Sequence, residues 1–255
     1  MKIEKLFESP GLPAFGIPPA LAASYGGDLG FPARCVFANL VESIDGVVAV
    51  RGAGESGAVI SGHSEADRFI MGLLRACAGA VLIGAGTLRA APEDLWYPDH
   101  VYPDAAPLYA QLRQRLGLLQ RPQLFVLSGA GSVDESHPAL QDGGIVVTTR
   151  RGAGRLGGAR TLIIDEDPIT PDTLLRELGH ARVLAEGGPT LIARLISAAL
   201  LDQLFVTVSP LLFGRYSGDG RKALTHGIDL RGARFDLLGA RRHESHLFLR
   251  YGKPA

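Results

Sequence analysis

Two short stretches of the sequence place glycines and polar side chains directly after an apolar run. In the first, AEGGPT at residues 185–190, Glu186 and two glycines separate the apolar residues 183–185 from Pro189, which suits the first turn of a helix. A helix start offers unpaired backbone N–H groups and the positive end of the helix dipole, and glycines let a phosphate come close to both. The stretch therefore predicts a nucleotide-binding site beside a carboxylate. A plain strand-to-helix turn with a solvated glutamate fits the same residues.

The second stretch, IGAGT at residues 83–87, follows a buried apolar strand. Gly84 and Gly86 expose backbone donors at the end of this strand, and Thr87 adds a hydroxyl, a combination that suits a pyrophosphate. The stretch lacks the third glycine of the Rossmann fingerprint and the acidic residue about 20 positions later. We therefore expect the two glycine-bearing strand ends to lie on adjacent strands and to hold one dinucleotide between them.

A third stretch, NLVESIDGVVAV at residues 39–50, carries Asp45 next to Gly46. Asp-Gly is a strong signal for a tight turn, and this is the first interpretation. The second interpretation is that Asp45 orients a substrate or supports proton delivery.

Apolar runs alternate with helical periodicity along the chain. Strands are predicted at residues 35–41, 80–83, 123–127, 145–149, 161–164, 182–185, 203–208 and 246–251, and helices at 65–77, 105–116, 171–179 and 190–200. This order predicts an α/β fold, a mixed, mostly parallel sheet flanked by helices on both faces, with the strands at 203–208 and 246–251 antiparallel. Such sheets bind ligands at the carboxyl ends of their strands.

Composition excludes several classes of protein. Lysine plus arginine equals aspartate plus glutamate at 26 each, so no net charge favours nucleic acid or a membrane surface. The two cysteines, Cys35 and Cys77, are too far apart for a CxxC motif, and no metal site is expected. Charged residues near the N-terminus and the lack of long apolar runs predict a cytoplasmic protein. Residues 1–33, rich in proline and glycine, predict a loosely structured leader that wraps the domain at 34–255 and helps to form a homodimer.

Taken in order, these motifs resemble the C-terminal reductase domain of RibD, a dihydrofolate-reductase-like family of riboflavin biosynthesis. The matching stretches are NLVESIDGVVAV, ISGHSEADRFIMGLLRACAGAVLIGAGTLRA, AEGGPTLIARLISAALLDQLFVTVSPLLFG and HLFLRYG, within residues 35–251. The resemblance implies a fold close to the one predicted above. It also implies that NADPH delivers a hydride to C1′ of ring-opened 5-amino-6-(5-phosphoribosylamino)uracil, giving the ribitylamino product.

The resemblance also assigns roles to residues. Glu186 would contact substrate and act in catalysis with Asp45, while Arg75 and Asn39 would approach the substrate and its phosphate. The residues implied to bind cofactor are Ser61, Gly84, Gly86, Thr87, Ser128, Gly187, Gly188, Pro189, Thr190 and Leu191.

The chain also departs from the family pattern. Where many members have Asp-Asp-Pro after the second stretch, this chain has LRAAPED, so a contact of that loop is expected to pass through Asp94 or Trp96. Asn39 stands where bifunctional members carry a lysine. The sequence also lacks the cysteine-containing motif of the deaminase zinc site. Two alternatives therefore stay open: an NADPH-dependent pterin or dihydrofolate reductase, and an NADP-binding protein without turnover.

Overall fold

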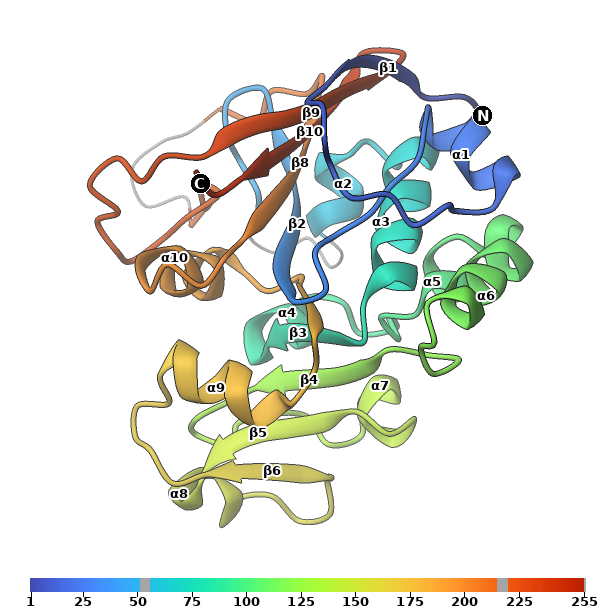
Figure 1. Ribbon diagram of the computed structural model, residues 1–255. Coiled ribbons are helices and arrows are strands. Elements are labelled where there is room, and N and C mark those ends of the chain that lie inside the picture. Colours follow the sequence, from blue (N-terminus) through green and yellow to red (C-terminus); the bar gives the residue numbers. More distant parts are fainter. Residues whose placement is uncertain (51–55, 215–219, 255) are drawn as a thin grey trace.

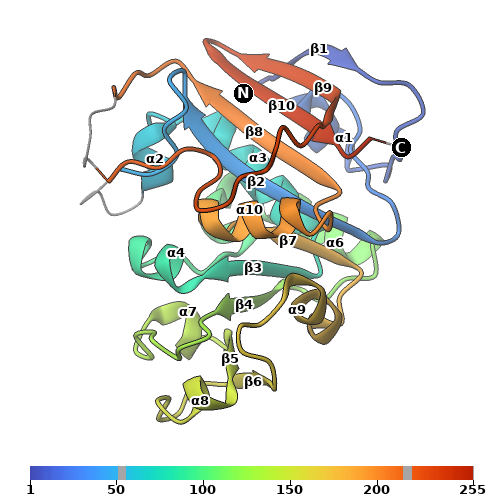
Figure 2. The ribbon, with the colours of Figure 1, turned by 90° about the vertical axis from the view of Figure 1, so that its left-hand side faces the viewer.

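A ten-stranded sheet organises the computed structural model, which describes residues 1–50, 56–214 and 220–254. The strands are β1 (Glu4–Glu8), β2 (Cys35–Ser43), β3 (Ala80–Gly84), β4 (Gln123–Leu127), β5 (Ile145–Thr149), β6 (Thr161–Ile164), β7 (Arg182–Ala185), β8 (Gln203–Ser209), β9 (Asp236–His243) and β10 (His246–Gly252). Their spatial order is β1-β9-β10-β8-β2-β7-β3-β4-β5-β6, which Figure 2 shows from top to bottom. Neighbours from β8 to β6 are parallel, whereas β10 pairs with β8 and β9, and β9 with β1, in antiparallel fashion.

Helices cover both faces of this sheet. They are α1 (Pro19–Tyr25), α2 (Ser56–Ile60), α3 (Glu65–Cys77), α4 (Ala85–Ala90), α5 (Pro98–Val101), α6 (Ala106–Arg115), α7 (Pro138–Gln141), α8 (Arg150–Ala153), α9 (Pro171–Leu178) and α10 (Pro189–Ser197), with a 3-10 turn at Pro103–Ala105. Figure 1 shows α3 and α6 on one side of the strands and α9 and α10 on the other. The fold class expected from the sequence is therefore confirmed.

The central strands contribute side chains to two separate cores because successive residues of a strand point to opposite faces. Val81 and Leu184 pack with α3 and α6, whereas Leu82 and Ala185 pack with α9 and α10. A strand buried on both faces must be apolar at nearly every position. This is why the short runs at β3 and β7 were recognisable in the sequence.

All the strands and helices predicted from the sequence are present, with small differences at their ends. The sequence interpretation missed β9 because its sequence, DLLGARRH, is rich in charged residues. Arg241 on this strand is nonetheless buried, with Nε donating to the Tyr25 carbonyl oxygen at 3.0 Å and with the guanidinium paired to Glu8. Charge pairing thus allows a strand that hydrophobic periodicity does not reveal.

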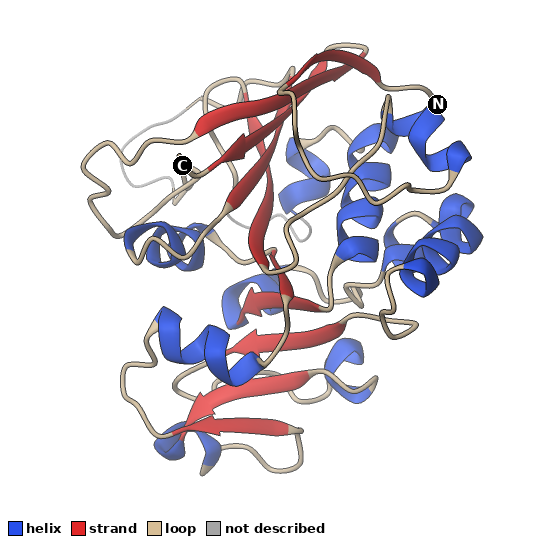
Figure 3. Ribbon diagram, in the orientation of Figure 1, coloured by secondary structure: helices blue, strands red, loops and turns tan. Residues whose placement is uncertain are grey.

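The first 33 residues also differ from the expectation of a loosely structured leader. They contain the strand β1, which pairs with β9 at the sheet edge, and the helix α1 (Figure 3). Leu21 and Tyr25 of α1 are buried. None of the helices in the described part of the chain combines the length and apolar character that a membrane crossing demands.

Candidate functional site

Three parallel strands, β2, β7 and β3, lie side by side in the middle of the sheet. Strand β7 lies between β2 and β3, and Ala185 at its end is level with Ala38 of β2 and Leu82 of β3. Glu186 and Gly84 therefore lie at the carboxyl ends of β7 and β3, at one edge of the sheet, and Asn39 lies beside them on β2, which continues to Ser43. The sequence-based expectation that the strand ends near Ile83 and Ala185 lie side by side is confirmed.

A cavity of about 1140 Å³ opens at this edge, bounded by α3, by the segments that follow β3 and β7, and by Lys222. Most of the site residues expected from the sequence line it. They are Asn39, Ser61, Arg75, Gly84, Gly86, Thr87, Glu186, Gly187, Gly188, Pro189, Thr190 and Leu191.

The glycines leave backbone exposed on the cavity wall. A Cβ at Gly84 would meet nothing within 4 Å, and a Cβ at Gly188 would lie 3.7 Å from the Thr87 hydroxyl oxygen, which brings the two glycine stretches together. Gly188 is the N-cap of α10, Pro189 follows it, and no side chain caps the first turn. The start of this helix therefore presents backbone N–H groups beside the cavity, as a phosphate site requires.

Gly187 has a different role, in packing. A Cβ there would lie 2.4 Å from Cδ2 of Leu191 and 3.1 Å from its Cβ. The absence of a side chain at Gly187 lets the first turn of α10 fold back against the end of β7.

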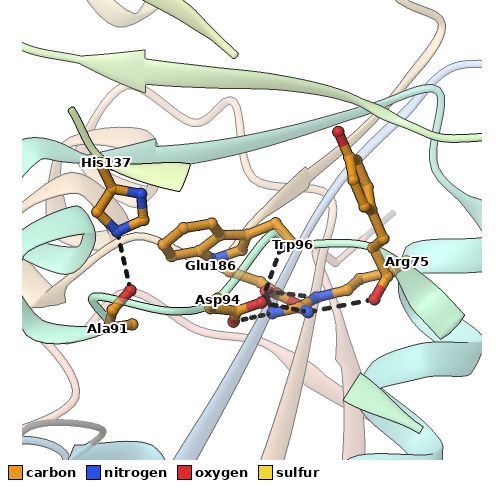
Figure 4. Close-up of polar contacts among 7 residues, drawn as sticks. Arg75, Ala91, Asp94, Trp96, His137 and Glu186 are labelled. Carbon is orange, nitrogen blue, oxygen red and sulfur yellow. Dashed lines mark hydrogen bonds and ion pairs between the residues drawn. The ribbon is translucent and has the colours of Figure 1, made fainter. Parts of the chain in front are cut away.

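Arg75 of α3 is buried between two carboxylates (Figure 4). Its Nε and Nη2 lie 3.0 and 2.7 Å from Oε2 of Glu186, while Nη1 and Nη2 lie 3.2 and 2.9 Å from the two Oδ atoms of Asp94. Nη1 also lies 3.5 Å from the carbonyl oxygen of Tyr97. The five N–H groups of the guanidinium therefore all face acceptors of the protein. Arg75 was expected to approach the substrate phosphate, but it has no open edge of donors for that role.

Two carboxylates thus share one positive charge. Burial raises the pKa of Glu186, as do the nearby Asp94 and Asp67, against the opposing effect of Arg75. Burial also acts to raise the pKa of Asp94, but the charge and hydrogen bonds of Arg75 prevail and lower it. At this site Asp94 is therefore the firmly ionised partner, and Glu186 is the group that takes up a proton more readily.

The loop that carries Asp94 is tied to the protein on its other side. The Trp96 N–H donates to Oδ1 of Asp94 at 2.8 Å, and the buried Trp96 ring lies 5.9 Å from the ring of His137. His137 Nε2 in turn lies 3.0 Å from the carbonyl oxygen of Ala91. Both residues that the sequence suggested for the altered loop, Asp94 and Trp96, line the cavity.

Asp67 lines the cavity as well, although it is not among the site residues predicted from the sequence. Its N–H does donate to Oγ of Ser64, 3.3 Å away, but its carboxylate is buried, hydrogen-bonded to Thr207, and lines the cavity. Burial raises its pKa, against the hydrogen bond from Thr207 and the charges of His246 and Arg68. The available signal was its position two turns before Arg75 on the same helix.

Two expected residues do not line the cavity. Asp45 lies in the predicted turn and accepts hydrogen bonds from Ser43 Oγ at 2.5 Å and from the N–H groups of Phe213 and Gly214 at 3.3 and 2.6 Å. These bonds lower its pKa and tie two loops together, as the turn interpretation suggests. Ser128 follows β4, where its Oγ accepts from the Ser132 N–H at 3.0 Å.

The arginines after β5 are engaged with neighbouring residues. Arg150 pairs with Asp165 and Arg151 with Asp167, and all four side chains are more than half exposed. In residues 1–50, 56–214 and 220–254 no group of three or more His, Cys, Asp and Glu side chains is arranged to hold a metal ion.

Comparisons with known proteins agree on the fold. The family model described as RibD C-terminal domain matches residues 34–248. A pyrimidine reductase-like protein from Corynebacterium diphtheriae has a TM-score of 0.70 at 21% identity, over 90% of this chain and 96% of that one. RibD from Acinetobacter baumannii has a TM-score of 0.65 at 21% identity, with 88% of this chain and 59% of that chain covered.

A third similar structure is the riboflavin biosynthesis reductase Rib7 from Saccharomyces cerevisiae. It has a TM-score of 0.58 at 15% identity, over 92% of this chain and 94% of that one. A comparison with the curated proteins gives no match.

Proposed function

Since this chain belongs to the RibD C-terminal domain family, we propose that it is an NADPH-dependent reductase of riboflavin biosynthesis. The reaction is hydride transfer to C1′ of 5-amino-6-(5-phosphoribosylamino)uracil, which gives the ribitylamino product. One observation carries the proposal: a buried carboxylate, Glu186, lines a single cavity together with the glycine-bearing ends of the adjacent strands β3 and β7.

The residues present fit a nicotinamide dinucleotide. The open backbone at Gly84 and the uncapped start of α10 at Gly188 supply N–H donors for phosphates, and Thr87 adds a hydroxyl between them. When bound, this cofactor supplies the hydride, so the protein itself needs no nucleophile. The protein then has two roles: it aligns the substrate with the cofactor, and it supplies one proton.

Glu186 is suited to both tasks. Its carboxylate can accept hydrogen bonds from ring N–H groups of the uracil, which discriminates against compounds without them. Reduction at C1′ consumes one proton for each hydride. Burial raises the pKa of Glu186, so this acid holds such a proton to higher pH than an exposed glutamate does.

The phosphate of the substrate needs cations other than Arg75, whose donors are engaged. Arg68 of α3, His100 of α5 and Lys222 also line the cavity, and all three are exposed. We assign the phosphate to this rim, where a guanidinium and an ammonium can face it through solvent-accessible donors.

Steady-state kinetics test the proposal. The purified protein should oxidise NADPH in the presence of the phosphoribosylaminouracil, with NADPH preferred over NADH. Glu186→Gln should lower turnover about 100-fold while the dissociation constant for NADPH stays close to that of the unchanged protein. Failure of the unchanged protein to use this substrate would overturn the proposal.

Asp67 favours a second candidate, reduction of a pterin or dihydrofolate. A buried carboxylate beside a threonine hydroxyl matches the paired N–H donors of a 2-amino-4-oxopyrimidine ring better than the carbonyl-flanked edge of a uracil. Asp67→Asn should then abolish oxidation of NADPH with dihydrofolate. Activity with dihydrofolate alone would favour this candidate over the first.

The proposal includes a cytoplasmic homodimer in which residues 1–33 accompany the reductase domain at 34–255. Light scattering coupled to gel filtration measures the oligomeric state. A mass of 27.0 kDa across the working concentration range would contradict the dimer.

A further inference from the structure

Asp94 and Glu186 hold different edges of the same guanidinium. Glu186 accepts from Nε and Nη2 in three contacts, and Asp94 accepts from Nη1 and Nη2 in two, so each carboxylate holds two nitrogens of Arg75 (Figure 4). The two acids come from separate parts of the chain, one after β7 and the other from the loop between α4 and α5. Arg75 is the only group that joins them among the contacts of Figure 4.

A planar guanidinium held along one edge can still turn about that edge. The contacts of Asp94 on the second edge remove this freedom, and the Trp96 N–H holds Asp94 in its own place. With Arg75 fixed, Oε2 of Glu186 takes two short contacts, whereas Oε1 has a single contact of 3.2 Å, from Nε. Oε1 is therefore the oxygen of Glu186 with acceptor capacity left for a ligand in the cavity.

The charged groups around Glu186 also connect it to Asp94. Arg75 and Asp67 face it from α3, Asp94 faces it from the loop, and His100 of α5 lies near Asp94. The positive charge of buried Arg75 thus favours the ionised forms of both Glu186 and Asp94. If Asp94 were neutral, the charge of Arg75 would act on Glu186 with less competition, and the pKa of Glu186 would fall.

We propose that Asp94 is a positioning residue: it holds Arg75 from the second edge, so that Glu186 keeps a single orientation and shares the positive charge. Its effect on turnover rests on the proposed function above. Its effect on Glu186 is independent of any substrate.

The decisive experiment measures Glu186 directly. Protein labelled with carbon-13 at the glutamate carboxyl groups is titrated by NMR, and the Glu186 signal is identified by its loss in Glu186→Gln. In Asp94→Asn we expect the titration midpoint of Glu186 to move to lower pH. The matched control is Asp104→Asn, which neutralises an exposed acid outside the cavity lining and should leave the midpoint unchanged.

Kinetics add a readout that a purely structural role would not change. With the phosphoribosylaminouracil, Asp94→Asn should lower kcat about 10- to 100-fold, leave the KM for NADPH within about twofold, and shift the pH profile of kcat with the NMR midpoint. Asp94→Glu keeps the charge and should restore most of kcat. If Asp94→Asn is unfolded by circular dichroism, Asp94→Ser replaces it, because it removes the charge with a smaller side chain.

The outcomes separate the two proposals. If the unchanged protein does not reduce the aminouracil, the proposed function fails, and the NMR titration still decides the role of Asp94. An unmoved Glu186 midpoint in folded Asp94→Asn would overturn the positioning role. A moved midpoint with unchanged kcat and pH profile would overturn its connection to the reaction.

Discussion

The backbone N–H of Glu186 donates a hydrogen bond to the carbonyl oxygen of Leu82, 3.0 Å away. This bond carries the pairing of β7 with β3 one step beyond the last pair, Leu82 with Ala185. Glu186 therefore leaves the sheet at a fixed point, one residue before the level of Gly84. The carboxylate and the glycine backbone are held together by the sheet itself rather than by flexible loops.

Gly187→Ala should destabilise the protein. The new Cβ would come within 2.4 Å of Leu191 Cδ2 and 3.1 Å of its Cβ, so the start of α10 must shift. Overpacking of this kind costs about 1–3 kcal/mol of unfolding free energy, measurable by urea denaturation. Gly158→Ala is the control, because a Cβ there meets nothing within 4 Å. Equal stability of the two variants would contradict the packing role of Gly187.

Gly84→Ala should fold normally and bind NADPH poorly. A Cβ at Gly84 points into open space in the protein alone, so the melting temperature should change by only a few degrees. If the cofactor lies against this backbone, the added methyl group displaces it, and the dissociation constant should rise about tenfold or more. Fluorescence titration with NADPH measures the effect. Undiminished affinity would place the cofactor elsewhere.

Arg75→Met should be among the most destabilising substitutions in the chain. It leaves Glu186 and Asp94 facing each other without a cation in a site where Arg75 is 1% exposed. Removal of one partner from a buried charge pair costs about 3–5 kcal/mol. Arg176→Met removes the exposed partner of Asp172 on α9 and should cost about 0.5 kcal/mol or less. Denaturation curves of the two variants test the difference.

Acid should weaken the contribution of Asp94 to stability. Arg75 lowers the folded-state pKa of Asp94 below its unfolded value of about 3.9, so the contribution is complete at higher pH and is lost as the pH falls through the folded pKa. The unfolding free energies of the unchanged protein and of Asp94→Asn should therefore differ most near neutral pH and converge in acid. A gap that stays constant down to about pH 3 would argue against ionised Asp94 as the cause.

Both cysteines should resist modification in the folded protein. Cys35 and Cys77 are buried, and burial raises the pKa of each thiol to about 12. Since the thiolate is the reactive form, an aromatic disulfide reagent should label neither thiol at neutral pH and both in urea. Rapid labelling of the native protein would show that the start of β2 or the end of α3 opens easily.

The sequence by itself determined the framework of the fold and the general place of the site. Apolar runs such as those of β3 and β7 and the helical period of α3 depend on which residues are adjacent, and this information is local. The glycines after β3 and β7 marked two strand ends for the same reason. Strand β9 escaped notice because its buried Arg241 depends on Tyr25 and Glu8, more than 200 positions away.

Only the tertiary structure decided how the polar residues divide their roles. Arg75 meets Glu186 across 111 positions and Asp94 across 19, which turns a residue expected to approach the substrate into the link between two acids. Asp45, two residues after the end of β2, instead accepts hydrogen bonds from the N–H groups of Phe213 and Gly214. Which side chains pair depends on how the connections between strands bring distant segments together. It also depends on which buried donors and acceptors have no water to bind. Neither can be read from the spacing of residues along one segment.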